Sequence, residues 1–311
     1  MSDPSSGIVD CAIVGGGPAG LTAALYLARF RRSVVVIDAG ESRAGLIPMV
    51  RNLCGFESGI AGHVLIDKVR RQVMSYDVPF YRALVTAARV RGDAFEVSYQ
   101  PTESTQTPLT LRARRVLAAC GIRDRLPPLA DAAALTQRGL LRLCPICDGY
   151  EAHDKCVAIF GPAKRALSHA LFFRTFARQV AVVASDMDSL GDDERRAANE
   201  RSVHLVTLGS IATPGDTEDK WQIKNVDGDR YTFDAVYPVM GCTPQAAWFD
   251  NLSIAQDATG MIVTDKHQRT SVDGLYAAGD LVNSLNQISV AAGEGAVAAS
   301  SIHSSLPPNP L

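Results

Sequence analysis

The glycine-rich turn at residues 15–20 constrains the fold of this chain more than any other feature of its sequence. An apolar stretch at 9–14 leads directly into the turn, and apolar residues then recur at helical spacing up to Arg31. A second apolar stretch, 34–37, ends at Asp38. This order of strand, turn, helix and strand predicts a βαβ unit of a parallel α/β fold.

Each glycine of this turn has its own physical role. Gly15 permits the tight turn, Gly17 lets a pyrophosphate approach the backbone, and Gly20 lets the helix pack close to the strand. The helix N-terminus attracts phosphate charge, and the carboxylate of Asp38 suits a ribose hydroxyl. The turn and the acid together predict a dinucleotide-binding site.

A second unit of the same kind is expected later in the chain. It comprises a strand at 156–160, a helix at 166–177 and a strand at 180–183. In its turn the middle glycine is replaced by Ala163, and Pro162 has no backbone N–H to offer to a phosphate. We therefore expect the fold of this unit to be retained and its phosphate cradle to be impaired.

The remaining pattern predicts an α/β protein of two Rossmann-like, three-layer ββα domains, the second inserted into the first. Residues 219–237 alternate like a hairpin with its turn at Gly228, and residues 239–244 are typical of a crossover back. A strand at 275–280 and a small-residue helix at 288–301 complete the first domain. The expected boundaries are residues 1–123 with 246–311 for the first domain and residues 124–245 for the second.

The pair Cys144 and Cys147, followed at once by Asp148, is the candidate redox centre. A helix beginning at the first cysteine would favour its thiolate, which is the nucleophile in disulfide exchange, and the adjacent acid would move the proton. A zinc site would need two further ligands, usually a second such pair, which the sequence lacks. Inert thiols are the other alternative.

Composition excludes several classes of function. The formal net charge of −2 gives no electrostatic basis for binding nucleic acid or an anionic membrane. The polar start and the absence of any apolar run close to the ~18 residues of a spanning helix predict a cytoplasmic protein with no membrane segment. Five further cysteines do not form a secretory framework and are expected to be buried structural thiols: Cys11, Cys54, Cys120, Cys156 and Cys242.

These features together resemble the low-molecular-weight thioredoxin reductase family, bacterial flavoproteins with a redox disulfide in their second domain. The resemblance runs from Asp10 to about Ser305 and includes further stretches at 52–55, 270–280 and 286–288. It implies that the first unit binds FAD, that the enzyme contains no metal, and that the protein is a homodimer.

The resemblance assigns FAD contacts across the first domain. Asp38 would hold the adenosine ribose, Asn52 would line the flavin site, and Asp280 would bond the ribityl chain, although a solvated cap is the alternative for Asp280. Residues 286–288 would direct a helix N-terminus at the flavin, where it stabilises the reduced anion. The full set is Gly15, Gly17, Pro18, Ala19, Gly20, Asp38, Asn52, Val85, Asp280, Asn286, Gln287 and Ile288.

The resemblance also assigns roles in the redox centre. Cys147 would be the sulfur nearer the flavin, while Cys144 would attack the partner disulfide to form a mixed disulfide that Cys147 resolves. Asp148 would supply and accept the proton, with a pKa raised by desolvation. His153 is the alternative acid and base, although a surface loop is the expected place for it.

The sequence departs from the family at the second nucleotide site. Family members carry arginines there that grip the 2′-phosphate of NADPH, whereas this chain has Asp186 and Asp188, which would repel it. The next basic pair, Arg195 and Arg196, is typical of an exposed helix face more than of a displaced clamp. NADPH is therefore doubtful, and NADH or a second FAD in this pocket stays open.

The function favoured by this pattern is an FAD-dependent disulfide oxidoreductase that does not use NADPH. Its partner would be a thioredoxin-like protein or a small disulfide or dithiol, and its electron donor a ferredoxin or another non-pyridine carrier. The alternatives are an NADPH-dependent thioredoxin reductase and an oxygen-using dithiol oxidase. A redox sensor or FAD-holding module is least expected, because it would not need the cysteine pair with its acid.

Overall fold

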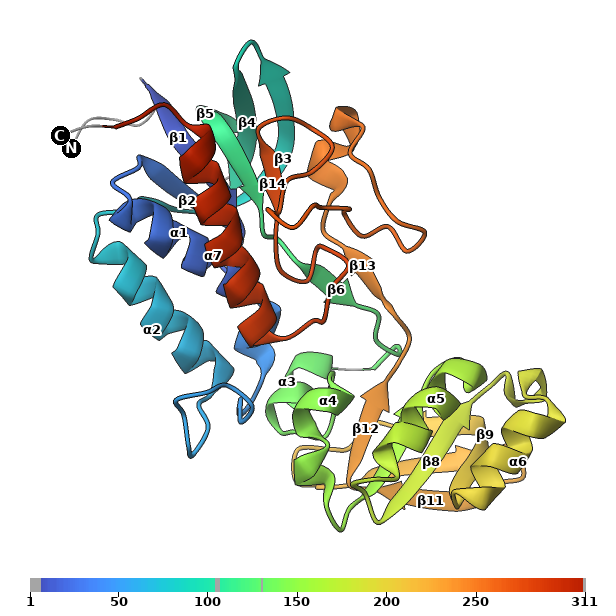
Figure 1. Ribbon diagram of the computed structural model, residues 1–311. Coiled ribbons are helices and arrows are strands. Elements are labelled where there is room, and N and C mark those ends of the chain that lie inside the picture. The colour runs from blue at the N-terminus through green and yellow to red at the C-terminus, as the bar shows by residue number, and fades with distance from the viewer. Residues whose placement is uncertain (1–6, 104–106, 130, 310–311) are drawn as a thin grey trace. The chain divides into compact units, whose positions relative to one another are not determined.

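The computed structural model describes residues 7–103, 107–129 and 131–309, which fold into the strands and helices drawn in Figure 1. The strands are β1 Ile8–Val14, β2 Val34–Asp38, β3 Phe80–Arg91, β4 Ala94–Pro101, β5 Leu109–Ala118, β6 Ile122–Asp124, β7 Cys156–Phe160, β8 Gln179–Ala184, β9 Val203–Ala212, β10 Trp221–Asn225, β11 Arg230–Phe233, β12 Ala235–Pro238, β13 Cys242–Pro244 and β14 Leu275–Ala277. The α-helices are α1 Pro18–Arg29, α2 Gly62–Met74, α3 Ala132–Gln137, α4 Pro145–Asp148, α5 Ala163–Phe173, α6 Asp192–Glu200 and α7 Ile288–Ser305. The 3-10 helices are η2 Arg43–Leu46, η3 Tyr150–Ala152, η4 Met187–Ser189 and η5 Ala247–Leu252. No helix within the described ranges is both long enough and apolar enough to cross a bilayer.

The chain forms two compact units, and the second is inserted into the chain of the first. The second unit comprises residues 46–59 and 124–242, and the remaining residues form the first unit. These limits differ from the predicted ones, because residues 46–59 group with the second unit and the return to the first unit comes after residue 242. Residues 46–59 lie within the first unit in sequence but make their contacts in the second. Such contacts cannot be deduced from the position of a loop in the chain.

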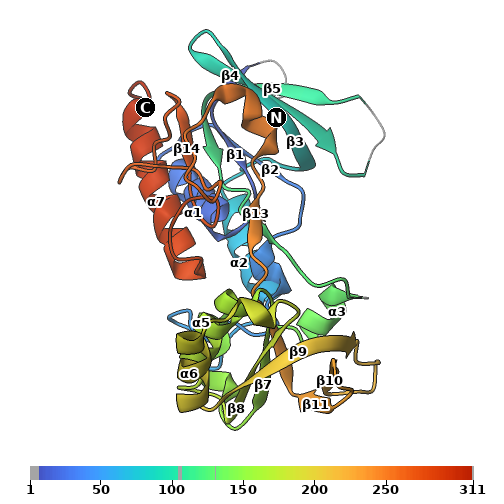
Figure 2. The same cartoon turned by 90° about the vertical axis from the view of Figure 1, so that its right-hand side faces the viewer.

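The first unit is built on a sheet whose parallel strands run in the order β14-β5-β1-β2-β3. β4 pairs antiparallel with β3 and with β5, which makes a meander over one face. Helices α1, α2 and α7 cover the other face, where Leu21, Leu27 and Ile302 are buried (Figures 1 and 2). Helices, parallel sheet and meander are the three layers that the sequence predicts.

Small residues let α7 pack directly on α1 in this unit. A Cβ atom on Gly295 would lie 2.3 Å from the carbonyl oxygen of Ala19, so only glycine permits this approach. β1 and β2 carry valine and isoleucine, and β2 is buried along its whole length, as a parallel strand between two layers requires. The glycine-rich turn therefore lies at the carboxyl end of β1, where it is held by closely packed strands and helices.

The second unit has a sheet in the order β11-β10-β9-β8-β7-β12, in which β12, β7, β8 and β9 are parallel. Helices α5 and α6 lie on one side of it (Figure 2), with Phe173 fully buried between helix and sheet. Trp221 is buried on the other side, where its Nε1–H donates to the carbonyl oxygen of Leu140 at 2.8 Å. This unit repeats the Rossmann-like architecture of the first.

Several predicted elements have different limits in the structure, among them the strand predicted at 275–280, which ends at Ala277. Helix α5 begins earlier and ends at Phe173, while α7 continues to Ser305. The predicted hairpin is formed by β10 and β11 only, because Ala235–Pro238 pairs in parallel with β7. The residues of β12 are apolar and mostly buried, so they suit a strand that is covered on both faces and not an exposed hairpin arm.

The prediction of buried structural thiols is correct for one of the five cysteines outside the redox pair. Cys11 is buried in β1, and burial raises the pKa of its thiol. Cys54 is exposed, whereas Cys120, Cys156 and Cys242 are half-buried. Cys54 lies in a loop, where apolar sequence neighbours do not define a buried face as they do in a strand.

Candidate active site

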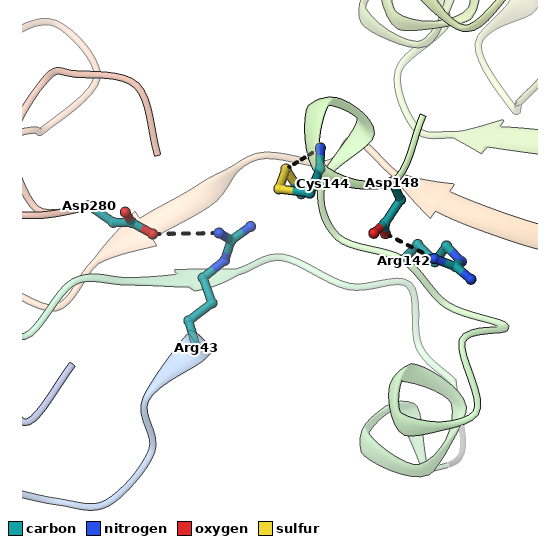
Figure 3. The surroundings of a disulfide bond; sticks show 6 residues. Arg43, Arg142, Cys144, Asp148 and Asp280 are labelled. Atoms are coloured by element: carbon teal, nitrogen blue, oxygen red, sulfur yellow. Dashed lines mark hydrogen bonds and ion pairs between the residues drawn. A yellow bond between two sulfur atoms is a disulfide. The ribbon is translucent and has the colours of Figure 1, made fainter. Parts of the chain in front are cut away.

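Cys144 and Cys147 form a disulfide at the N-terminus of α4, with 5.3 Å between their Cα atoms (Figure 3). Pro145 presets the first helical φ angle, and Cys144 is the N-cap residue. The backbone N–H of Cys147 donates to Sγ of Cys144 at 3.2 Å, so an amide reaches the first sulfur as the sequence predicts. This bond stabilises negative charge on Cys144 when the disulfide opens, which suits that sulfur to attack or leave as a thiolate.

Asp148 ends the same helical turn and is mostly buried. Burial raises the pKa of its carboxyl, in the direction expected from the sequence, because the charged form loses its hydration. Arg142 opposes this shift, since its Nη1 lies 3.3 Å from Oδ2 of Asp148 (Figure 3). Sequence reasoning missed Arg142, and its position just before the cysteine pair was the only available signal.

Tyr237 and His153, two further titratable side chains near this centre, differ in their environment. Tyr237 of β12 is buried, and burial together with the charge of Asp148 raises the pKa of its phenol, so the phenol keeps its proton. His153 is exposed, and its Nδ1 lies 2.9 Å from Oδ2 of Asp154, which agrees with a surface loop. Among the residues that the structure describes, no cluster of His, Cys, Asp or Glu could hold a metal ion.

The first glycine turn forms a cradle that admits no side chain at Gly15 or at Gly20. Gly15 has a φ of 109°, and a Cβ atom there would lie 2.3 Å from the carbonyl oxygen of Ala119. A Cβ on Gly20 would lie 2.0 Å from the carbonyl oxygen of Gly15. Helix α1 begins after Gly17, an N-cap residue that has no side chain. A helix N-terminus that follows a glycine turn of this kind fits the pyrophosphate of FAD.

Asp38 lies against this turn at the end of β2. A Cβ on Gly16 would lie 2.5 Å from Oδ2 of Asp38, and Nη2 of Arg70 donates to the same oxygen at 3.0 Å. The buried Nε of Arg70 has no hydrogen-bond partner in the described part of the chain. Arg70, which the sequence did not single out, thus holds in place the acid that is predicted to bind the ribose.

Asp280 follows β14 and lies close to the same turn. A Cβ on Gly279 would lie 3.0 Å from the Cβ of Ala19. Glu294 of α7 accepts the N–H of Gly279 at 2.7 Å, and Nη1 of Arg43 lies 3.5 Å from Oδ2 of Asp280 (Figure 3). Asp280 therefore belongs to a polar network at the carboxyl ends of the strands, where α/β folds bind ligands.

The remaining predicted FAD residues lie in three places. Helix α7 begins at Ile288 with Gln287 as N-cap, so a helix N-terminus is present where the sequence predicts it, and half-buried Asn286 precedes it. Val85 is buried in β3. Asn52 is exposed in the segment 46–59, which groups with the second unit. Their contacts with FAD stay predictions.

The second glycine turn is occupied by a side chain of the protein. Oδ1 of Asp186, which follows β8, accepts the N–H of Ala163 at 2.9 Å. Ala163 is the first residue of α5, so a carboxylate caps the helix where a phosphate would bind in a nucleotide site. Pro162 just before it has no N–H to donate.

The basic pair after this turn is only partly exposed, which corrects the expectation of an exposed helix face. Arg195 is half-buried, and it donates to the carbonyl oxygens of Met187 at 2.7 Å and of Leu190 at 3.1 Å. Its long side chain folds back over η4, where the carbonyl oxygen of Met187 also accepts the backbone N–H of Leu190 at 3.3 Å. Arg196 is exposed as expected and pairs with Asp193.

Comparisons with known proteins agree with this geometry. The pattern of the family described as pyridine nucleotide-disulphide oxidoreductase matches residues 9–295. Thioredoxin reductase of Listeria monocytogenes is 30% identical over 305 residues, which cover 94% of this chain and 92% of that protein. The crystal structure of thioredoxin reductase from Streptococcus pyogenes has a TM-score of 0.84 at 28% identity and covers 96% of this chain and 97% of its own.

The crystal structure of HlmI is equally similar, with a TM-score of 0.84 at 28% identity, covering 96% of this chain and 92% of that one. Family pattern, curated relatives and solved structures therefore coincide with the disulfide centre and the glycine cradle described above. The chain belongs to the pyridine nucleotide-disulphide oxidoreductase family and is a thioredoxin reductase-like, FAD-dependent disulfide oxidoreductase.

Proposed function

We propose that this enzyme exchanges electrons between its flavin and the Cys144–Cys147 pair without drawing them from NADPH. The observation that carries the proposal is the hydrogen bond from the N–H of Ala163 to Asp186. That N–H opens helix α5, where a nucleotide phosphate would need donors and positive potential. A carboxylate already accepts from it, and a second anion at the same place would be repelled.

The two turns of this chain support the proposal by their contrast. In the first unit Nη2 of Arg70 donates to Asp38 at 3.0 Å, and the N-cap residue of α1 is Gly17, which has no side chain. In the second unit Asp186 turns to the start of α5 instead. Asp38 and Asp186 occupy equivalent places at the ends of β2 and β8. Asp38 leaves the first glycine turn available to a phosphate, whereas Asp186 blocks the second.

The region that would grip a 2′-phosphate carries two acids, and its half-buried arginine donates to the backbone. Asp186 and Asp188 follow β8, and both are exposed. Arg195 reaches back to this segment, but it donates to the carbonyl oxygens of Met187 and Leu190. The two acids would repel a phosphate at this place. The guanidinium of Arg195 already donates to backbone carbonyl oxygens, so it does not offer the phosphate the charge-assisted bonds that an arginine normally makes.

The chain's own residues account for the sulfur and proton chemistry. When a dithiol reduces the centre, the Cys144–Cys147 bond breaks, two enzyme thiols form and the dithiol becomes a disulfide. Bound FAD would accept the two electrons as the enzyme disulfide re-forms. Asp148 takes up a proton released in that step and returns it in the reverse direction, while the N–H of Cys147 steadies the thiolate of Cys144.

The relatives named thioredoxin reductase make a thioredoxin-like protein the first partner to test, followed by a small disulfide or dithiol. Ile146 and Tyr150 beside the disulfide are 56% and 84% exposed, which offers apolar contact to either. A ferredoxin or another non-pyridine carrier would supply or accept the electrons. NADH, a second FAD in the second unit and a homodimer are the further predictions that accompany this proposal.

The proposal predicts that NADPH reduces the bound flavin slowly. Each lost charge-assisted hydrogen bond to phosphate costs about 1.5–3 kcal/mol, so two losses weaken binding by about 10²–10⁴-fold. Anaerobic stopped-flow mixing of oxidised enzyme with NADPH, NADH or dithiothreitol measures this directly. Fast bleaching at micromolar NADPH would contradict the proposal, whereas bleaching by the dithiol followed by rapid reoxidation in air would assign oxygen as an acceptor.

Removing the blocking carboxylate should partly restore the response to NADPH. We expect Asp186→Ala to increase the rate of flavin reduction at limiting NADPH by about tenfold, since one N–H is released and one repulsive charge is lost. Asp188→Ala is the matched control, because it removes an equal charge from the same segment and leaves the bond to Ala163 in place. Equal gains in the two variants would show that charge alone, and not the capped amide, limits NADPH.

A further inference from the structure

Arg142 is held by the protein on several sides. Its backbone N–H donates to the carbonyl oxygen of Val236 in β12 at 3.0 Å. Its Nε donates to the carbonyl oxygen of Gly139 at 3.0 Å, and its Nη1 lies 3.3 Å from Oδ2 of Asp148 (Figure 3). The guanidinium is therefore anchored to the backbone at one edge and presents the other edge to the carboxylate.

This ion pair is shielded from water to an extent that matters energetically. The side chains of Arg142 and Asp148 are 23% and 18% exposed. Exposed pairs contribute little, whereas a pair in lower dielectric interacts more strongly and controls the charge state of its acid. Burial raises the pKa of Asp148, and Arg142 is the largest influence that lowers it.

The other charged groups around Asp148 act in both directions. Glu151 of η3 favours the protonated acid, while Lys155 before β7 favours the carboxylate by its charge. Glu151 is itself paired with Arg51 at 3.6 Å. Tyr237 of β12 is buried and neutral, so it adds no charge. Arg142 is therefore the group that combines an opposite charge with direct contact.

We propose that Arg142 is a positioning residue that holds Asp148 as a carboxylate beside the reduced cysteine pair. In this state the acid can take up the proton that is released when the two thiols give their electrons to the flavin and the disulfide re-forms. The inference rests on the proposed function, because it concerns the same proton transfer, and it adds the group that sets the pH range of that transfer.

The test is the pH dependence of flavin reduction by dithiothreitol under argon. We expect the pH profile of Arg142→Gln to move to higher pH, and its rate at mildly acidic pH to be about tenfold lower than that of the wild type. This figure is the lower bound of the effect that an opposite charge at this distance has on the ionisation of a carboxyl group. The rate should recover at alkaline pH, where Asp148 loses its proton without help. The same dithiol is used throughout, so its own ionisation cancels between variants.

Two further variants separate positioning from general effects. Lys155→Gln removes an equal charge that acts on Asp148 only at a distance, and its profile should move less. Arg142→Lys keeps the charge and should restore the profile in part. Visible absorbance and the thermal midpoint of each variant establish that FAD is bound and the fold retained before rates are compared.

Specific outcomes would overturn the inference. A uniform loss of rate at all pH values in Arg142→Gln, or equal shifts in Arg142→Gln and Lys155→Gln, would assign Arg142 a structural or merely electrostatic role. A wild-type flavin that no dithiol reduces at any pH would instead refute the proposed exchange itself. The two failures are therefore distinguishable in one series of measurements.

Discussion

The Cys147→Ser variant is expected to remain yellow and to lose electron transfer between the flavin and any disulfide or dithiol partner. Without Sγ of Cys147 the enzyme disulfide cannot form, and Cys144 alone cannot carry two electrons. We expect a loss on the order of 10³-fold or more, as for removal of a catalytic nucleophile. The amount of FAD bound per chain shows whether the variant keeps its cofactor. Single-turnover bleaching of the flavin by dithiothreitol measures the loss of electron transfer.

The Cys144→Ser variant distinguishes the roles of the two sulfurs. It leaves Cys147 as an unpaired thiolate, which should give a long-wavelength absorbance band beside oxidised flavin if Cys147 is the sulfur that serves the flavin. Cys54→Ser is the control, because this exposed thiol lies outside the redox pair and its loss should change neither rate nor spectrum. A band seen only in Cys147→Ser would reverse the two roles, and full activity in both variants would place the redox centre elsewhere.

Gly15→Ala should yield protein that binds no FAD. The alanine Cβ would lie 2.3 Å from the carbonyl oxygen of Ala119, and the φ of 109° is one that side chains rarely adopt. The backbone must move to relieve this contact, which opens the cradle and costs about 1–3 kcal/mol of stability. Bound FAD per chain and the midpoint of thermal unfolding report the two effects separately.

Gly92→Ala is the matched control for that experiment. Gly92 also has a positive φ, of 64°, but a Cβ there meets nothing within 4 Å. We expect it to cost about 1–2 kcal/mol from the left-handed backbone alone and to leave FAD bound. If Gly15→Ala retained FAD as well as Gly92→Ala does, the turn at residues 15–20 would not be the cofactor cradle.

The elements predicted most accurately are those that a local constraint defines. The stretches 9–14 and 34–37 can be read as strands because strands of a buried parallel sheet are near-continuous apolar runs. Helix α1 follows from the glycine turn, and α4 from the proline between the cysteines. The limits of α5 and the strand β12 could not be predicted, since they depend on which strands become neighbours in the sheet.

The sequence by itself determined the family, the disulfide centre and the departure at the second turn. These features depend on residues close together in the chain: a glycine where φ is positive, a proline without an N–H, and two cysteines within one helical turn. Backbone sterics and the reach of one turn impose the same geometry wherever such a pattern occurs. For that reason Gly15, Pro162 and the Cys144–Cys147 pair could be interpreted without coordinates.

Only the tertiary structure decided which partner each carboxylate has. Asp38 is bound by Arg70 of α2, Asp186 by the amide of Ala163, and Asp148 by Arg142. Sequence does not encode the direction of a long arginine side chain or the rotation of an aspartate, because both are set by packing, which for Asp38 and Asp186 joins segments that are remote in the chain. Those contacts set the charge and availability of each acid, and so they decide which turn can receive a phosphate and which carboxylate can move a proton.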